Sequence, residues 1–258
     1  MPITGTCALC QTPASALLGS HIVPEFFYKR VYTNTHKFIA ITLDEEERLP
    51  PEQKGFRENL LCAACETKFS YWERALSLFL NQVISGSYST CSTTQMGAVT
   101  VVNGVDYANV KMAVLSIFWR MSIAKHKLFS LYKLGPYEEV FRRLLDQGSV
   151  PASTEFPVLL SKGMLDGVFR PGILFPVGRG RYMNHLIIQS VVLNGIVFDC
   201  FMTRTHTIPE EVVEFSLQSN GRVCIPSKSY EQLGMNLDEF SQRMKGQDVK
   251  KFYQKHSR

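Results

Sequence analysis

The chain has 258 residues, of which 45% are hydrophobic, and its formal net charge at pH 7 is +5. This composition is ordinary for a globular protein and predicts a sizeable core in one large domain or two modest ones. No uninterrupted apolar run reaches the roughly 18 residues of a membrane helix. Residues 1–6 have neither the basic nor the apolar region of a signal peptide. We therefore expect a cytoplasmic protein without a membrane partner.

Four of the seven cysteines form two doublets, Cys7-x-x-Cys10 and Cys62-x-x-Cys65. An odd number of cysteines does not suit a secreted disulfide framework. Two doublets supply four thiolates, which is the ligand set of a structural Zn²⁺ site. The other cysteines are scattered, and the one in an apolar, strand-like run is expected to be an inert core residue: Cys91, Cys200 and Cys224, of which Cys200 lies in that run.

Two other uses of the doublets remain open. A redox motif needs one doublet at the start of a helix after a strand, and it leaves the second doublet unexplained. Iron–sulfur ligation is disfavoured by the 51 residues that separate Cys10 from Cys62. A structural zinc site is therefore the preferred interpretation.

The N-terminal part predicts short strands followed by a helix. Residues 31–41 suit strands around a polar turn, and the acidic, proline-rich residues 44–58 suggest an exposed insertion between the two halves of the zinc site. After Cys65, apolar residues recur every three or four positions, which predicts an amphipathic helix that ends near Gly86. Its apolar residues are Phe69, Trp72, Leu76, Phe79, Leu80 and Val83.

The middle of the chain predicts a linker, a hairpin and two helices. Residues 85–94 are rich in Ser, Thr and Gly and read as a loop. Asn103-Gly104, flanked by valines, predicts a tight hairpin. Periodic apolar residues predict a helix over residues 107–131, broken by Gly135-Pro136, and a second helix follows over residues 137–147 with Gly148 as its cap.

The C-terminal part changes to a strand pattern and ends in a charged tail. Asn194-Gly195 is the strongest hairpin signal of the chain. Pro209-Glu210-Glu211 suggests a proline-started helix or a turn, and residues 228–256 look helical and charged. The expected strands are residues 156–160, 173–177 and 186–202. The chain is therefore expected to be α+β, with a C-terminal α+β module of unknown function.

Three polar residues near the doublets are candidates for chemistry. His21, in the segment Ser20-His21-Ile22-Val23-Pro24, is either a structural histidine or a general base that takes a proton from water. Asn59 is either a turn or cap residue or one that holds His21. Glu66 is either a first-turn helix acid or an oxygen ligand for a hard divalent ion such as Mg²⁺.

These residues together resemble the HNH endonuclease family of ββα-metal, treble-clef nucleases, over about the first 75 residues. The resemblance implies that Cys7, Cys10, Cys62 and Cys65 hold a structural zinc and that His21 is the general base. It places the central Asn of the family at Asn59 and the last metal-binding residue at Glu66, which would hold a catalytic Mg²⁺ or Mn²⁺. The sequence departs from the family pattern at Ser20, where Asp or His is common, and at Glu66, where His or Asn is usual.

The implied organisation is an HNH-like, treble-clef zinc domain (residues 1–86), a linker and hairpin (residues 87–105) and the α+β module (residues 106–258). The implied function is a metal-dependent DNA endonuclease, and analogy with the family suggests bacterial defence or a mobile element. The alternative is a catalytically inactive, zinc-stabilised protein that binds nucleic acid or protein. In a third hypothesis, the C-terminal module binds a small ligand.

Several basic residues are candidates for contact with DNA. Between Arg243 and Arg258 there are six basic residues and one aspartate. Such a tail is either a solvated helix face or an arm that meets phosphate. Lys29 and Arg30, which follow the His21 segment, are likewise either solvated surface charges or phosphate contacts. The candidate nucleic-acid-binding residues are Lys29, Arg30, Lys250 and Lys251.

Overall fold

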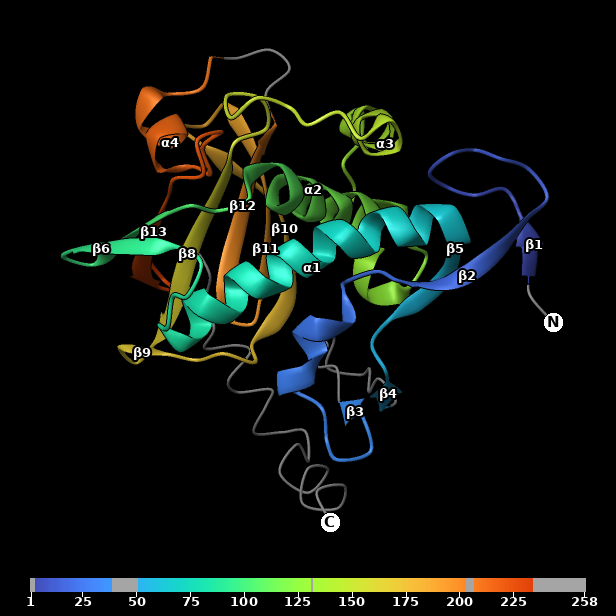
Figure 1. Cartoon of the computed structure of the whole chain (residues 1–258), viewed down its shortest axis with the longest axis horizontal. Coiled ribbons are helices and arrows are strands. Elements are labelled where there is room, and N and C mark those ends of the chain that lie inside the picture. Colours follow the sequence, from blue (N-terminus) through green and yellow to red (C-terminus); the bar gives the residue numbers. More distant parts are fainter. Residues whose placement is uncertain (1–2, 39–50, 131, 203–206, 234–258) are drawn as a thin grey trace.

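The computed structural model describes residues 3–38, 51–130, 132–202 and 207–233, which form a mixed α/β protein. A small three-stranded sheet lies at one end of the molecule and an eight-stranded sheet at the other, with α1 and α2 running between them (Figure 1). In the described part of the chain, no helix is both long enough and apolar enough to cross a membrane.

The small sheet has the strand order β1-β2-β5 and carries both cysteine doublets. β2 (Ser15–His21) pairs antiparallel with β1 (Ile3–Gly5) on one side and with β5 (Arg57–Cys62) on the other. A 3₁₀ helix, η1 (Glu25–Arg30), follows β2, and β3 (Lys37–Phe38) pairs with β4 (Glu52–Gln53).

Helix α1 (Ala63–Ser85) starts directly after β5 and ends as predicted. Gly86 caps it in the left-handed conformation (φ 71°), and its amide donates to the carbonyl of Gln82. All six residues of the predicted apolar face are buried. The amphipathic pattern therefore located both the helix and its buried side.

Helix α2 (Tyr107–Ile123) is buried on all sides, because every residue from Val110 to Ser122 is buried. It packs between α1 and the large sheet (Figure 1). The short η2 (Lys127–Phe129) follows, and then α3 (Tyr137–Gln147), whose bounds and Gly148 cap agree with the prediction.

The large sheet has the strand order β10-β11-β12-β8-β13-β7-β6, with β9 attached to β8. The contact between β13 and β8 is parallel, and the other strand pairs described are antiparallel. α4 (Glu210–Phe215) begins after Pro209, as predicted. The strands are β6 (Ser92–Met96), β7 (Val99–Asn103), β8 (Val158–Leu165), β9 (Val168–Phe169), β10 (Leu174–Tyr182), β11 (Leu186–Leu193), β12 (Ile196–Met202) and β13 (Val223–Ser229).

One of the two predicted hairpins is confirmed and the other is wrong. Asn194-Gly195 joins β11 to β12, and both residues have positive φ, as a tight turn requires. By contrast, the hairpin of β6 and β7 closes at Gly97-Ala98. Asn103-Gly104 instead leads into α2, because the Asp106 side chain caps that helix by accepting from the amide of Asn109.

Four further expectations need correction. The helix expected over residues 107–131 ends at Ile123, and residue 131 lies outside the described residues. Phe56, in the insertion expected to be exposed, is only 6% exposed, while residues 44–50 are outside the description. Within residues 31–41, β3 is the strand described and residues 39–41 are not covered. The helix expected over residues 228–256 is not found where it is described: residues 228–229 belong to β13 and residues 230–233 form a turn. Residues 234–256 lie outside the described residues.

A single buried cluster runs through both ends of the chain. It includes Cys7 and Leu9 beside the first doublet, Trp119 of α2, and Leu160 and Phe198 of the large sheet. The predicted division into a zinc domain (residues 1–86), a linker and hairpin (residues 87–105) and an α+β module (residues 106–258) stays a prediction. The described residues on both sides of it share one core.

Candidate metal centre and active site

The four doublet cysteines come together at one point. Their Sγ atoms all lie within 4.8 Å of one another, and Cys10 Sγ is 3.9 Å from Cys62 Sγ. In a tetrahedral site with Zn–S bonds of about 2.3 Å, neighbouring sulfurs are about 3.8 Å apart. The cluster can therefore hold a metal ion such as zinc. No other group of three or more potential metal ligands occurs among the residues that the structure describes.

Two turns aim the sulfurs inward. In the turn between β1 and β2, Gln11 is left-handed (φ 59°) and its amide donates to the Cys7 carbonyl (3.0 Å). The second doublet spans the junction of β5 and α1. The Cys62 amide points at Cys7 Sγ (3.4 Å), which ties the two doublets together. The two turns and the contact between the Cys62 amide and Cys7 Sγ therefore bring together cysteines that are 55 positions apart in the sequence.

Burial and a neighbouring hydroxyl shift the pKa values of the cluster's thiols in opposite directions. A hydrogen bond with the Thr12 hydroxyl lowers the pKa of Cys10 to about 6. Burial raises the pKa of the Cys7 and Cys65 thiols. Burial therefore disfavours the two inner thiolates unless a cation compensates their charge, and a bound metal ion does so directly.

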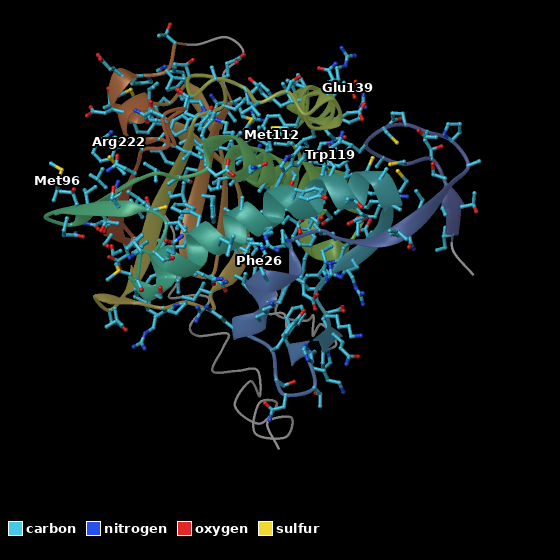
Figure 2. All side chains as sticks on the ribbon, viewed as in Figure 1. Phe26, Met96, Met112, Trp119, Glu139 and Arg222 are labelled. Atoms are coloured by element: carbon cyan, nitrogen blue, oxygen red, sulfur yellow. The ribbon has the colours of Figure 1, made fainter. Side chains whose placement is uncertain are left out.

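Helix α3 is hydrogen-bonded to the turn that carries Cys7 and Cys10. Arg142 Nη1 donates to the Leu9 carbonyl (2.6 Å), and its Nε pairs with Glu139 (2.7 Å). Glu139 stands on the outer side of α3 (Figure 2). Lys68 of α1 donates to the carbonyl of Asp146 in α3 (2.6 Å). The metal centre is thus supported by residues far downstream in the chain.

His21 is the last residue of β2, and a main-chain carbonyl fixes its ring. Its Nε2 lies 2.9 Å from the carbonyl oxygen of Lys54. A carbonyl oxygen only accepts, so Nε2 carries the proton and a neutral His21 has its lone pair on Nδ1. The left-handed conformations of Lys54 and Gly55 (φ 62° and 74°) bring this carbonyl to the ring. His21 therefore has the tautomer that a base acting through Nδ1 needs.

The register of β2 and β5 shows which residues share a face with His21. His21 lies opposite Arg57, Ser20 opposite Glu58, and Gly19 opposite Asn59. Opposed residues, and residues two apart, lie on one face of a ladder. His21 and Asn59 are therefore on the same face, and Asn59 is exposed there.

Ser20 lies on the opposite face and has a structural role. It is 1% exposed, and its Oγ accepts a hydrogen bond from the amide of Leu61 (3.2 Å). The position at which the HNH pattern commonly has a metal ligand is thus occupied here by a hydroxyl that holds β2 to β5.

Glu66 sits in the first turn of α1, and its Oε1 is buried without a hydrogen-bond partner among the described residues. A buried carboxylate oxygen in this state lacks a positive or donating group, and a cation would supply one. No hydrogen bond or ion pair within the described ranges joins His21, Asn59 and Glu66 to one another. Lys29 and Arg30 are exposed at the end of η1, and Lys250 and Lys251 lie outside the described residues.

Sequence reasoning missed a buried arginine behind His21. Arg120 of α2 is 1% exposed, its Nη1 donates to the His21 carbonyl (2.7 Å), and its Nη2 pairs with Glu73 of α1 (2.7 Å). The preceding residue, Trp119, is labelled in Figure 2. Its ring packs edge-on against Phe69 of α1. A charged residue inside an otherwise apolar helical run was the available signal. Arg120 thus links the His21 carbonyl to the carboxylate of Glu73. Glu73 lies about 10.5 Å along α1 from Glu66, so the carboxylate linked to His21 is not the one predicted from the sequence.

No protein-family model, no curated protein and no solved structure matches this chain.

Proposed function

We propose that this protein is a zinc-stabilised, metal-dependent DNA endonuclease of the HNH type, with a treble-clef N-terminal domain. The observation that carries the proposal is the ring of His21, which the Lys54 carbonyl holds with Nδ1 as the basic nitrogen. The course of the chain agrees with a treble clef: a cysteine turn between β1 and β2, then β5, then a helix that starts within the second doublet.

Each candidate residue has a defined role in phosphodiester hydrolysis. His21 Nδ1 takes a proton from a water molecule, whose oxygen attacks phosphorus while the bond to the leaving oxygen breaks. Asn59, on the same face, orients the groups around His21. Glu66 would hold Mg²⁺ or Mn²⁺, an ion that stabilises charge on the phosphate and the leaving oxygen. Zinc held by the four cysteines would tie the turn before β2 to β5 and α1, and it would take no part in the reaction.

Plasmid nicking tests the proposal. Zinc-loaded protein is incubated with supercoiled plasmid and Mg²⁺ or Mn²⁺, beside His21→Ala and the control His185→Ala. His185 is an exposed histidine at the turn before β11. Nicking by the wild type and His185→Ala, with loss of at least about a hundredfold in His21→Ala, is expected for a general base. A wild type that binds zinc and nicks in neither metal contradicts the proposal.

The buried Ser20 favours a second candidate, a zinc-stabilised binding protein without catalysis. Its hydroxyl is committed to Leu61, so this position offers no ligand beside His21. This candidate predicts that wild type and His21→Ala bind duplex DNA or a protein partner equally well and that neither cuts DNA. Equal affinity in a fluorescence-anisotropy titration, together with no nicking, would establish it for DNA.

A further inference from the structure

Strand β5 separates two adjacent charges onto opposite faces. The Glu58 carboxylate accepts hydrogen bonds from the amides of Lys125 (2.8 Å) and His126 (2.7 Å), just after α2. Arg57 points to the other face, directly opposite His21, and is exposed. The acidic neighbour of Arg57 is therefore turned away from it and occupied by main-chain donors.

Within the described ranges, the guanidinium of Arg57 forms no ion pair and no hydrogen bond. Lys54, whose carbonyl fixes the His21 ring, is also exposed. Glu25 and Arg57 both interact electrostatically with Tyr32, whose hydroxyl is buried without a hydrogen-bond partner among the described residues.

Distance permits Arg57 and His21 to act on one group. Opposed residues in an antiparallel pair have their Cβ atoms about 5 Å apart. The guanidinium of arginine matches phosphate oxygens and can donate two hydrogen bonds at once. A phosphate within reach of a water at His21 is thus also within reach of Arg57.

We propose that Arg57 is the phosphate-binding residue of the His21 face and that it holds the backbone of the nucleic-acid substrate beside the bond that is cut. This inference rests on the proposed function, and it adds the contact that places the substrate. Arg57 binds phosphate before and during the reaction, so its loss raises KM more than it lowers kcat.

The experiment compares Arg57→Gln, Arg57→Lys and the control Arg179→Gln on full-length, zinc-loaded protein. Arg179 is an exposed strand arginine of β10, in the other sheet, without an ion pair among the described residues. In nicking assays, Arg57→Gln is expected to raise KM about tenfold with kcat changed less than about threefold. Arg57→Lys is expected to recover part of this loss, and Arg179→Gln to match the wild type.

A binding measurement separates this inference from the proposed function. Anisotropy titrations of duplex DNA with the three variants are run over a series of salt concentrations. Loss of one phosphate contact is expected to reduce the slope of log K against log salt by about one in Arg57→Gln but not in Arg179→Gln. If the wild type binds but does not cut, the nuclease proposal fails and the slope still tests Arg57. Equal slopes and affinities for both glutamine variants, or no DNA binding by the wild type, overturn the inference.

Discussion

Arg120 Nη1 donates a 2.7 Å hydrogen bond to the main-chain carbonyl oxygen of His21, although the two residues are 99 positions apart. The same guanidinium pairs with Glu73 at 2.7 Å, lies over the Phe69 ring, and bonds Ser116 of its own helix. One buried charge therefore joins β2, α1 and α2. The position of the candidate base depends on a helix outside the zinc-binding segment.

Replacing Arg120 with methionine removes this junction. Glu73 then keeps a charge without its partner, and the His21 carbonyl loses its donor. Breaking a fully buried pair in this way costs about 3–5 kcal/mol of the free energy of unfolding, and because Glu73 is 22% exposed the loss is expected at the lower end of this range or below it. Urea denaturation measures it. Arg74→Met, at an exposed position of α1, is expected to change stability by less than about 0.5 kcal/mol. Similar losses in both variants would show that the Arg120 contacts contribute little.

The cysteine cluster predicts a defined metal content. Wild-type protein is expected to carry about one zinc per chain, measured by elemental analysis after exhaustive dialysis. Cys62→Ser is expected to lose the metal and to unfold β5 from the cysteine turn, because the remaining thiols cannot close the site. Cys91→Ser, which changes a cysteine outside the cluster, keeps it. Full zinc occupancy in Cys62→Ser would exclude the four-cysteine site.

Signals that act within a few residues predicted much of the fold. The apolar period of α1, the glycine caps of α1 and α3 and the turn at Asn194-Gly195 are local, and all agree with the structure. Asn103-Gly104 shows the limit of such signals. The same dipeptide suits a hairpin or the approach to a helix, and the Asp106 cap that decides between them is itself ambiguous in sequence.

The site also has a part that the sequence predicts and a part that it does not. The sequence alone predicts that the two cysteine doublets meet, because a zinc site needs four ligands whatever the length of chain between them. The contacts around His21 carry no such requirement. Arg120, Lys54 and Glu58 reach the site through pairings between distant segments, which depend on how α2 and β5 pack rather than on any local pattern.

Lys111 predicts a pH dependence of stability that arises away from the candidate site. It is 0% exposed, and its Nζ donates to the carbonyls of Glu155 (3.0 Å) and Phe156 (2.5 Å). Burial lowers the pKa of Lys111 from 10.5 to about 8. Between these values the unfolded chain binds more protons than the folded one, so this group's contribution to stability rises with pH, by about 3 kcal/mol in all.

The variant Lys111→Met isolates this effect, because other titrating groups are common to both proteins. The free energy of unfolding of the wild type relative to Lys111→Met is expected to increase by about 3 kcal/mol from about pH 7 to about pH 10.5. Urea denaturation at a series of pH values measures it. Parallel curves for the two proteins would mean that Lys111 is not held as a desolvated cation.

The turn at Lys54 and Gly55 packs closely against His21, and substitution of Gly55 tests this packing. Gly55 and Gly86 have almost the same left-handed conformation (φ +74° and +71°), so alanine at either position carries a similar backbone cost of about 1–2 kcal/mol. Their surroundings differ. A Cβ on Gly55 would lie 2.8 Å from Tyr28 and 3.2 Å from Cδ2 of His21, whereas a Cβ on Gly86 meets nothing within 4 Å.

Gly55→Ala is therefore expected to destabilise the protein by about 1–3 kcal/mol more than Gly86→Ala. It should also shift the NMR resonances of the His21 ring, because the added methyl group lies 3.2 Å from its Cδ2 and the ring or the turn must move to admit it. Gly86→Ala should leave those resonances in place. Since both variants share the backbone cost, the difference between them measures the packing of this turn against His21. Equal stability losses with an unmoved His21 ring would mean that the turn does not position the base.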